Sequence, residues 1–216
     1  KDYTVYNIDY AVKGYVTSTI NYRLRQDALF PAAVEDCKCA VRWMRANAKK
    51  YNVDPDKIGV IGGSAGGHLS LMLGYCDDSA MEGTGGNPEQ SSRVQAVVNF
   101  YGVPDLTGDL AKNAPEAINF LGKKQDEDFA LYAKASPLTF LSKDDPPTLT
   151  FHGTIDELVP VLESDRLHAN LDALGIPNAY DKIAGWPHTM DAAVEINKHC
   201  QYVMDRFLEK YLPLPK

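Results

Sequence analysis

The sequence predicts an α/β fold in which a mostly parallel sheet is flanked by helices on both faces. Strand-like apolar runs alternate with helix-like runs along most of the chain. The clearest unit joins the apolar run 58–61 to a helix-like run over 69–75 through a glycine-rich turn. A long amphipathic run from Pro31 to about Tyr51 precedes it, with apolar residues at steps of three and four. A strand, a long helix and another strand in series indicate parallel pairing with a right-handed crossover.

Further elements are expected on either side of this unit. In the run 15–21, Val16, Ser18 and Ile20 alternate with threonines, which predicts a strand after a short helix over 3–12. Downstream, the sequence predicts strands over 94–101, 148–151 and 179–183, and helices over 115–121, 127–133, 161–174 and 191–211. A chain of 216 residues fits a single domain, 1–216, that is large enough to bury a core.

The composition argues against several classes of partner. The formal net charge is −7 at pH 7 and no basic stripe is present, so neither nucleic acid nor an anionic membrane is expected to bind. No apolar run approaches the roughly 20 residues of a membrane-spanning helix. The first residues lack the charged and apolar regions of a signal peptide, so a cytoplasmic location is favoured and secretion is left open.

The four cysteines, Cys37, Cys39, Cys76 and Cys200, show no metal-binding spacing. Cys37 and Cys39 are too close in one helix to face each other, so we expect free thiols that are partly buried in helices. Paired aspartates in two loops also lack the spacing of a metal site, and no Gly-Lys-Ser/Thr follows the glycines of the turn. The sequence therefore predicts neither a metal nor a cofactor.

A serine stands at the apex of the glycine-rich turn, in the pattern Gly62-x-Ser64-x-Gly66. Between a strand and a helix, this pattern is typical of a nucleophile elbow, in which the serine backbone is strained and the residues two positions away must lack bulk. Gly62 and Gly66 meet that need. The N–H of Ala65 would lie at a helix N-terminus, where it can bind a developing oxyanion. A turn without chemistry and a phosphate cradle are the alternatives.

A serine nucleophile needs a base and a carboxylate that orients the base. Asp156 lies on the loop that leaves one predicted strand, in a His-Gly-x-x-Asp pattern. His188 lies on the loop after another predicted strand, in a Gly-Trp-Pro-His pattern. Because the carboxyl ends of parallel strands meet at one edge of a sheet, we predict Ser64 as the nucleophile, His188 as the general base and Asp156 as the orienting carboxylate.

Other side chains suit these roles less well. Asp191 is the second candidate carboxylate, but it follows His188 so closely that a helix-capping role is expected instead. The remaining histidines are expected to pack at a strand end or to lie in helices: His152, and His68, His168 and His199. Arg23 and Asp36 are expected to form a structural ion pair or a hydrogen-bond network at the edge of the sheet.

The likeness to a known family rests on the segments 18–24, 30–37 and 41–47, on the turn at Ser64, and on the His-Gly-x-x-Asp segment with the Val-Pro that follows it. In these segments the chain resembles the α/β-hydrolase carboxylesterases. It is most similar to the bacterial esterase/lipase branch, which includes hormone-sensitive-lipase-like enzymes and carbohydrate or feruloyl esterases. The likeness covers nearly the whole chain, and the order Ser, Asp, His is the order of this superfamily.

The resemblance implies an α/β-hydrolase fold with a cap-like insertion over the active site at 103–145. The alternative is that this segment is an ordinary insertion that makes no contact with the substrate. The family also places a His-Gly-Gly-Gly motif, which supplies further oxyanion N–H groups, before the first helix. This sequence contains no such motif, so the chain resembles a hydrolase that lacks its N-terminal strands. A sheet edge left unpaired in this way would favour a homodimer.

The function expected from these residues and this resemblance is hydrolysis of carboxylic esters through an acyl-enzyme. The resemblance points to short-acyl esters or to acetylated and feruloylated carbohydrates as small-molecule substrates. Trp186 is a candidate for the substrate pocket, with core packing or plain surface as open alternatives. A peptidase of the prolyl-peptidase kind and a non-catalytic binding protein of the same fold are the competing functions.

Overall fold

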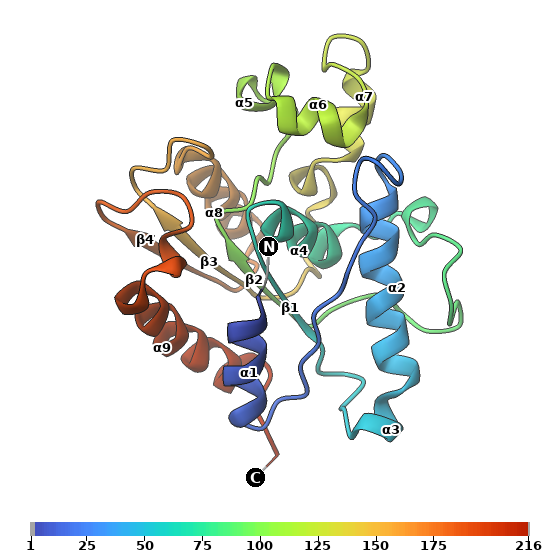
Figure 1. Cartoon of the computed structure of the whole chain (residues 1–216), viewed down its shortest axis with the longest axis vertical. Coiled ribbons are helices and arrows are strands. Elements are labelled where there is room, and N and C mark those ends of the chain that lie inside the picture. Colours follow the sequence, from blue (N-terminus) through green and yellow to red (C-terminus); the bar gives the residue numbers. More distant parts are fainter. Residues whose placement is uncertain (1–2, 216) are drawn as a thin grey trace.

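The computed structural model describes residues 3–215, which fold around a four-stranded parallel sheet with helices on both faces (Figure 1). The strands are β1 (Gly59–Gly63), β2 (Ala96–Phe100), β3 (Thr148–Gly153) and β4 (Asn178–Ile183), and they lie side by side in this order. Each neighbouring pair is parallel. The predicted fold class, a parallel sheet between layers of helices, is confirmed.

Helices alternate with the strands along the chain. The α-helices are α1 (Thr4–Val12), α2 (Ala32–Ala46), α3 (Ala48–Tyr51), α4 (Ala65–Tyr75), α5 (Asp109–Lys112), α6 (Pro115–Leu121), α7 (Phe129–Lys134), α8 (Leu162–Leu174) and α9 (Val194–Tyr211). Short 3-10 helices are η1 (Ser79–Met81), η2 (Pro137–Phe140) and η3 (Met190–Ala192). The predicted long helix over 31–51 is therefore α2 followed by α3, with a break at Asn47.

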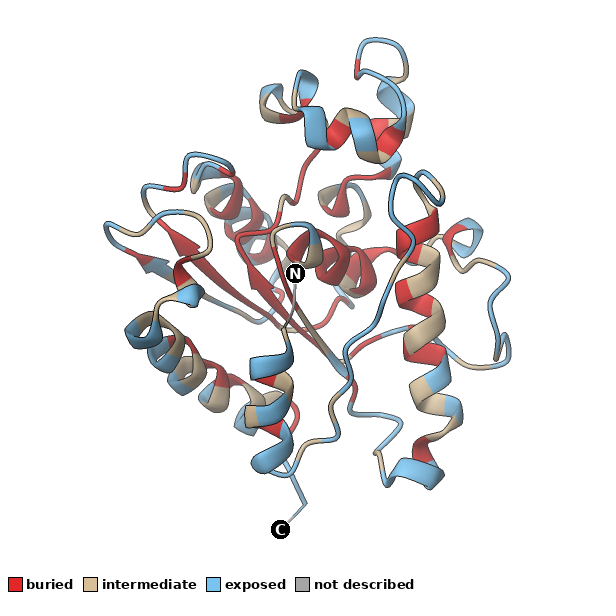
Figure 2. Ribbon diagram, in the orientation of Figure 1, coloured by how far each residue is buried: buried red, intermediate tan, exposed pale blue. Residues whose placement is uncertain are grey.

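The two faces of the sheet bury different clusters. Along β2, Val97 packs with residues of α2, α4 and α8, whereas Val98 and Phe100 pack with residues of α1 and α9. This follows from the alternation of side chains in a strand. All five residues of β2 are buried, and Figure 2 shows the middle of the sheet and α4 almost wholly buried. Burial on both faces explains why β2 reads as a continuous apolar run in the sequence.

The predicted strand over 15–21 is wrong, because these residues form no ladder. Tyr15 anchors the segment, with its N–H donating to Tyr10 O at 3.0 Å and its Oη to Leu212 O at 3.1 Å. Val16 and Ile20 remain 48% and 39% exposed. A segment with a strand-like pattern becomes a strand only where a neighbouring strand pairs with its backbone N–H and C=O groups. No strand in residues 3–215 pairs with this segment.

The edge strands of the described sheet are β1 and β4. An edge strand presents N–H and C=O groups that can pair with another chain, which is the physical basis of the expected homodimer. That association stays a prediction.

Two smaller expectations concern α2 and its surroundings. Arg23 and Asp36 form the predicted ion pair, with Arg23 Nη2 2.8 Å from Asp36 Oδ1, although the two side chains are 44% and 25% exposed and lie near the surface. The four cysteines are free thiols, as predicted. Of these, only Cys39 is half-buried rather than buried.

Residues 103–145 leave the sheet and form a separate layer above its carboxyl edge, which is the upper part of Figure 1. The layer is made of α5, α6 and α7, whereas η2, near the end of the segment, packs against the cluster that contains α4. Two hydrogen bonds connect the layer to the loop before α2. Arg25 Nη1 donates to Asn119 Oδ1 at 2.5 Å, and Phe30 N donates to Phe120 O at 3.0 Å. The layer has a small core of its own, made of Leu106, Ala111, Ala117, Leu121, Tyr132 and Ala135.

Candidate active site

Ser64 occupies a strained turn between β1 and α4. Its φ of 56° and ψ of −117° lie in a region that residues other than glycine rarely adopt. The Ser64 N–H donates to Phe100 O at 2.9 Å, which ties the turn to the end of β2. Backbone strain of this kind persists only where the surrounding structure imposes it, and it is concentrated at functional sites.

The glycines on the two sides of Ser64 have different roles. A Cβ on Gly62 would collide with the backbone of Gly66, so the turn requires glycine at position 62. A Cβ on Gly66 would meet no atom within 4 Å. The prediction that both positions must lack bulk is therefore wrong at Gly66. The close contact in this turn is between position 62 and the backbone of Gly66, and a side chain on Gly66 would point into open space.

The turn and two loops bring Ser64, His188 and Asp156 together at the carboxyl edge of the sheet. His188 Nε2 lies 3.0 Å from Ser64 Oγ, and His188 Nδ1 lies 2.6 Å from Asp156 Oδ2. Because an ionised carboxylate can only accept, Nδ1 carries the hydrogen and the Nε2 lone pair faces the serine hydroxyl. In this tautomer His188 can take a proton from Ser64.

The carboxylate of Asp156 is buried and well supplied with donors. Its Oδ1 accepts from the N–H groups of Leu158 and Val159, each at 2.9 Å, and its Oδ2 lies 3.2 Å from His152 Nε2. Burial by itself would raise the pKa of Asp156, but the hydrogen bonds from His152, His188 and Val159 hold this pKa well below its usual range. Asp156 is therefore ionised beside His188 at neutral pH.

His152 is the donor that the sequence reasoning missed. It is fully buried, as expected for a histidine packed at a strand end. Its Nε2 lies 2.8 Å from Val159 O, so Nε2 carries the hydrogen and also faces Asp156, while Nδ1 accepts from Ser164 Oγ at 2.7 Å. The His-Gly-x-x-Asp spacing is the signal that could have found this contact.

Tyr101 packs directly on the imidazole of His188. The ring centroids are 4.5 Å apart at an interplanar angle of 57°, and Tyr101 is 1% exposed with a φ of 42°. The Tyr101 hydroxyl donates to Asp191 Oδ1, and Tyr3 Oη lies 3.5 Å from Asp191 Oδ2. Asp191 thus anchors two tyrosines, and its predicted helix-capping role is wrong, since neither η3 nor α9 is capped by its side chain.

An apolar cavity of about 400 Å³ lies beside Ser64 and His188. Its walls come from the loop before α2, from α4 and from the 103–145 layer, and they include Ala65, His68, Leu69, Val103, Leu106 and Phe120. Ala65 is the first residue of α4, so its N–H is one of the donors that a helix leaves unpaired at its N-terminus. This N–H and the Ser64 hydroxyl belong to one cavity wall.

Among the described residues, Trp186 is not one of those that line this cavity. The half-buried indole packs against the cluster formed with α1 and α9. The Trp186 carbonyl accepts from Ile155 N at 3.1 Å, and a Cβ on Gly153 would collide with the Trp186 backbone. Trp186 therefore joins the loop that carries His188 to the loop that carries Asp156, and its expected substrate contact stays a prediction.

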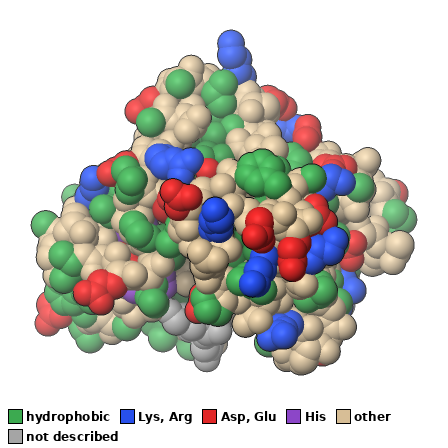
Figure 3. Space-filling view, turned by 90° about the horizontal axis from the view of Figure 1, so that it is seen from above, with side chains coloured by type: hydrophobic (Ala, Val, Ile, Leu, Met, Phe, Trp, Pro, Cys, Tyr) green, Lys and Arg blue, Asp and Glu red, His purple; other side chains and the backbone are tan. Residues whose placement is uncertain are grey.

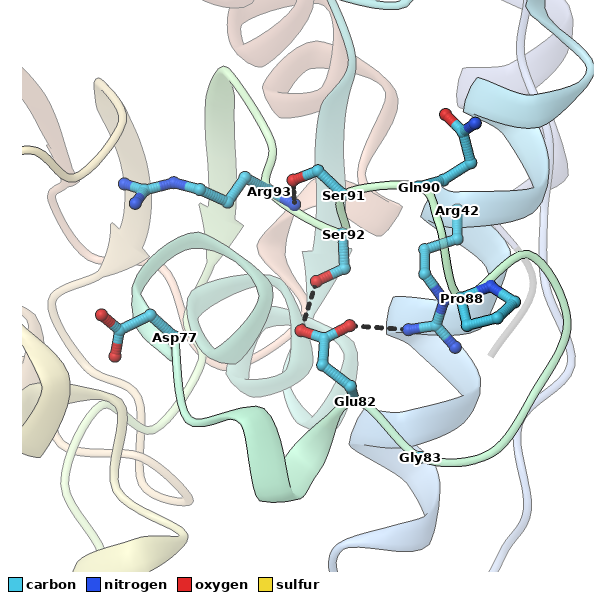
Figure 4. Close-up of a pocket in the computed structure, with 9 residues that line it drawn as sticks. All are labelled: Arg42, Asp77, Glu82, Gly83, Pro88, Gln90, Ser91, Ser92 and Arg93. Atoms are coloured by element: carbon cyan, nitrogen blue, oxygen red, sulfur yellow. Dashed lines mark hydrogen bonds and ion pairs between the residues drawn. The ribbon is translucent and has the colours of Figure 1, made fainter.

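A second pocket, of about 280 Å³, lies between α2 and the loop after α4 (Figure 4). Glu82 lies at its centre, with Oε2 2.7 Å from Arg42 Nη1 and Oε1 2.8 Å from Lys38 Nζ. Figure 4 shows Ser92 and Arg42 reaching the two oxygens of Glu82 from opposite sides. Because both cations are paired and 2% exposed, this network indicates a structural role.

On the face that carries the 103–145 layer, positive and negative side chains are intermixed with hydrophobic ones (Figure 3). Within residues 3–215, no group of three or more histidine, cysteine or acidic side chains could hold a metal ion. No helix in the same part of the chain has the length and apolar character needed to cross a membrane.

Comparison with known proteins gives a consistent result. Residues 1–171 match the model of the BD-FAE family. The probable carboxylic ester hydrolase LipM of Mycobacterium tuberculosis is 37% identical over 156 residues, which are 70% of this chain and 36% of LipM. Esterase LipQ of the same organism is 32% identical over 191 residues, covering 85% of this chain and 44% of LipQ. The chain thus spans less than half the length of these two relatives.

The fold has close counterparts among solved structures. A structure described as a truncated form of a carbohydrate esterase from gut microbiota superposes with a TM-score of 0.76 at 31% identity. That superposition covers 87% of this chain and 72% of the other.

Proposed function

Because this chain belongs to the BD-FAE family of α/β-hydrolase carboxylesterases, we propose that it is a serine hydrolase that cleaves carboxylic esters. The observation that carries the proposal is the continuous contact from Ser64 Oγ through His188, at 3.0 Å, to Asp156, at 2.6 Å. A serine hydroxyl is a weak nucleophile at neutral pH, and an adjacent base with an orienting carboxylate activates it.

In the first half of the reaction, Ser64 Oγ attacks the ester carbonyl carbon while His188 Nε2 takes the hydroxyl proton. Asp156 holds the imidazole in the productive tautomer and stabilises the imidazolium that forms. When the tetrahedral intermediate collapses, His188 returns the proton to the departing alcohol oxygen. The ester C–O bond breaks and the acyl group remains on Ser64.

In the second half, water attacks the acyl carbon and His188 Nε2 takes a proton from it. Collapse of this intermediate breaks the bond to Ser64 Oγ, which regains its proton from His188, and the carboxylic acid leaves. In both halves the N–H of Ala65 donates to the oxyanion, where the positive end of the α4 dipole adds to the stabilisation.

The cavity walls are mainly aliphatic and aromatic, so we expect the substrate to carry an apolar group on one side of its ester bond. Short-acyl esters and acetylated or feruloylated carbohydrates are the proposed substrates, in keeping with the carbohydrate esterase of similar structure. In this assignment the 103–145 layer acts as a cap that contacts the substrate.

Hydrolysis of p-nitrophenyl acetate tests the proposal. Ser64→Ala and Asp156→Asn should each lower kcat by at least about 10³-fold, while Ser79→Ala, which changes an exposed serine, should leave kcat unaltered. Equal activity of the Ser64→Ala and native proteins would show that this serine is not the nucleophile.

A further inference from the structure

Arg166 connects α8 to the base of the 103–145 layer. The helix lies beside the segment that leads from β2 to α5 (Figure 1). Arg166 Nη2 lies 2.6 Å from Asp105 Oδ2, and Arg166 Nη1 lies 3.3 Å from Glu163 Oε1. Asp105 and Glu163 are only 7% and 6% exposed. One guanidinium therefore bridges two buried carboxylates, one at the base of the layer and one on α8.

The carboxylate of Asp105 is held in place on the side of the layer. Its Oδ1 accepts from Thr107 N at 2.8 Å and from Thr107 Oγ1 at 2.6 Å, which leaves Oδ2 for Arg166. A Cβ on Gly108 would lie 3.3 Å from Arg166 Nη1, so the guanidinium also lies close to the backbone before α5. Burial by itself would raise the pKa of Asp105, but the hydrogen bonds from Thr107 and the charge of Arg166 hold this pKa below its usual value.

On the other side, Arg166 belongs to the part of α8 that supports the orienting carboxylate. Ser164, in the first turn of α8, donates to His152 Nδ1 at 2.7 Å, and His152 Nε2 lies 3.2 Å from Asp156 Oδ2. Glu163 directly precedes Ser164. The contact between Arg166 and Asp105 therefore connects the layer to the helical turn on which the position of Asp156 depends.

The apolar cavity lies between the two parts that Arg166 connects. Leu106, which follows Asp105, lines the cavity from the layer, and Leu158 and Val159 line it from the loop before α8. The N–H groups of Leu158 and Val159 also donate to Asp156, so this side of the cavity is fixed relative to the proposed catalytic residues. The separation of the two walls then depends on how the base of the layer is held against α8.

We propose that Arg166 is a positioning residue that sets the width of the cavity, so that the protein prefers esters whose apolar group is large enough to contact Leu106. This inference rests on the proposed ester hydrolysis. Arg166 acts through Asp105 and is not among the described residues that line the cavity. A guanidinium suits this role because its planar set of donors can bond two carboxylates at once.

Esters of different size test the selection. Ethyl acetate serves as the small substrate, ethyl butyrate extends the acyl side, and benzyl acetate extends the alcohol side. The native protein should favour at least one of the larger esters over ethyl acetate by about tenfold in kcat/KM. Changes of this ratio between variants are free of differences in intrinsic reactivity, because each variant acts on the same esters.

The first variant is Asp105→Asn, in which the amide oxygen can still accept from Thr107 N while the amide nitrogen faces Arg166 as a second donor. It should lower the ratio by about fivefold, through KM for the larger ester, with kcat/KM for ethyl acetate within about twofold of native. Arg166→Gln should have the same effect on the ratio, and the double variant should lower it no further, since both changes remove one contact.

Lys182→Gln is the matched control. Lys182 pairs with Asp165 on α8, and its side chain is 43% exposed, as is that of Arg166, but it contacts β4 and not the layer. This variant should keep the native ratio. A ratio that neither Asp105→Asn nor Arg166→Gln changes would overturn the proposal. An equal fall of kcat/KM for small and large esters would also overturn it, because a loss of folded protein lowers all rates alike.

Amide hydrogen exchange separates this inference from the proposed activity. The N–H groups of Leu106 and Ala111 are bonded within the layer, to Ser136 Oγ and Gly108 O. Their exchange should be at least about tenfold faster in Arg166→Gln than in the native protein or Lys182→Gln. If exchange is faster but no ester is hydrolysed, the connection stands and the proposed function fails. If esters are hydrolysed with native exchange and native selection in Arg166→Gln, the inference fails while the function stands.

Discussion

Tyr101 shows how a single residue can hold the proposed base in place. Its ring covers the His188 imidazole, and its hydroxyl is bonded to Asp191 on the loop that also carries His188. The positive φ of Tyr101 sets the ring in this direction at the end of β2. The contact between Tyr101 and Asp191 limits rotation of His188 away from Ser64.

Removing only the Tyr101 hydroxyl should therefore affect turnover more than binding. Tyr101→Phe should lower kcat for p-nitrophenyl acetate by roughly tenfold with little change in KM, because the base becomes less well oriented. Steady-state kinetics measures both constants. Tyr202→Phe, which removes the hydroxyl of a tyrosine that is 61% exposed, is the control. A rise in KM at unaltered kcat would argue against a positioning role.

Asp145 gives a prediction on stability and pH. Burial raises the pKa of Asp145 to about 6, well above the value of about 3.9 in an unfolded chain. Between these values the native state binds more protons than the unfolded state, so the free energy of unfolding contributed by this group falls as the pH rises. Above about pH 6 the destabilisation is complete.

Asp145→Asn should accordingly raise the free energy of unfolding by roughly 1–3 kcal/mol at neutral pH and change it little near pH 4. Denaturant unfolding at the two pH values measures the difference. Asp126→Asn, in an exposed turn, is the control. An equal effect of Asp145→Asn at both pH values would contradict the assigned pKa.

At the scale of elements, α2 is held to the loop after α4 by Glu82. Its carboxylate pairs with Lys38 and Arg42, which are one turn apart on α2 and almost wholly buried. A buried cation that loses its partner is strongly destabilising, since its charge is left without compensation.

Glu82→Ala should lower the free energy of unfolding by roughly 3 kcal/mol, because it leaves two buried cations unpaired. Thermal or urea unfolding gives the value, and Glu89→Ala, an exposed change in the same loop, should stay within about 0.5 kcal/mol of the native protein. A loss no larger than that of the control would mean that the network contributes nothing to stability.

The sequence predicted most elements because their signals are local. Three such signals can be read directly from the sequence: Pro115 at the first turn of α6, the apolar run of β2, and Gly175 directly after α8. The segment 15–21 carries an equally good strand pattern and fails, because a strand also depends on a neighbour that the pattern does not encode.

At the scale of the whole molecule, the parallel sheet explains why the site could be placed from the sequence. Ser64, Asp156 and His188 each follow a strand, and parallel strands end at one edge, so their meeting follows from topology. The bond between Tyr101 and Asp191 joins residues 90 apart and has no local signal. The cavity wall likewise combines the loop before α2, the start of α4, the 103–145 layer and the loops that carry Asp156 and His188, and no local sequence pattern signals their meeting.

The proposed activity requires that Ser64, His188 and Asp156 form a working nucleophile in this chain. Intact-mass spectrometry after treatment with a fluorophosphonate tests it most directly. The native protein and Ser79→Ala should each gain a single adduct, and Ser64→Ala should gain none. A folded native protein that gains no adduct, or a Ser64→Ala protein that is labelled as fast as the native one, would contradict the account.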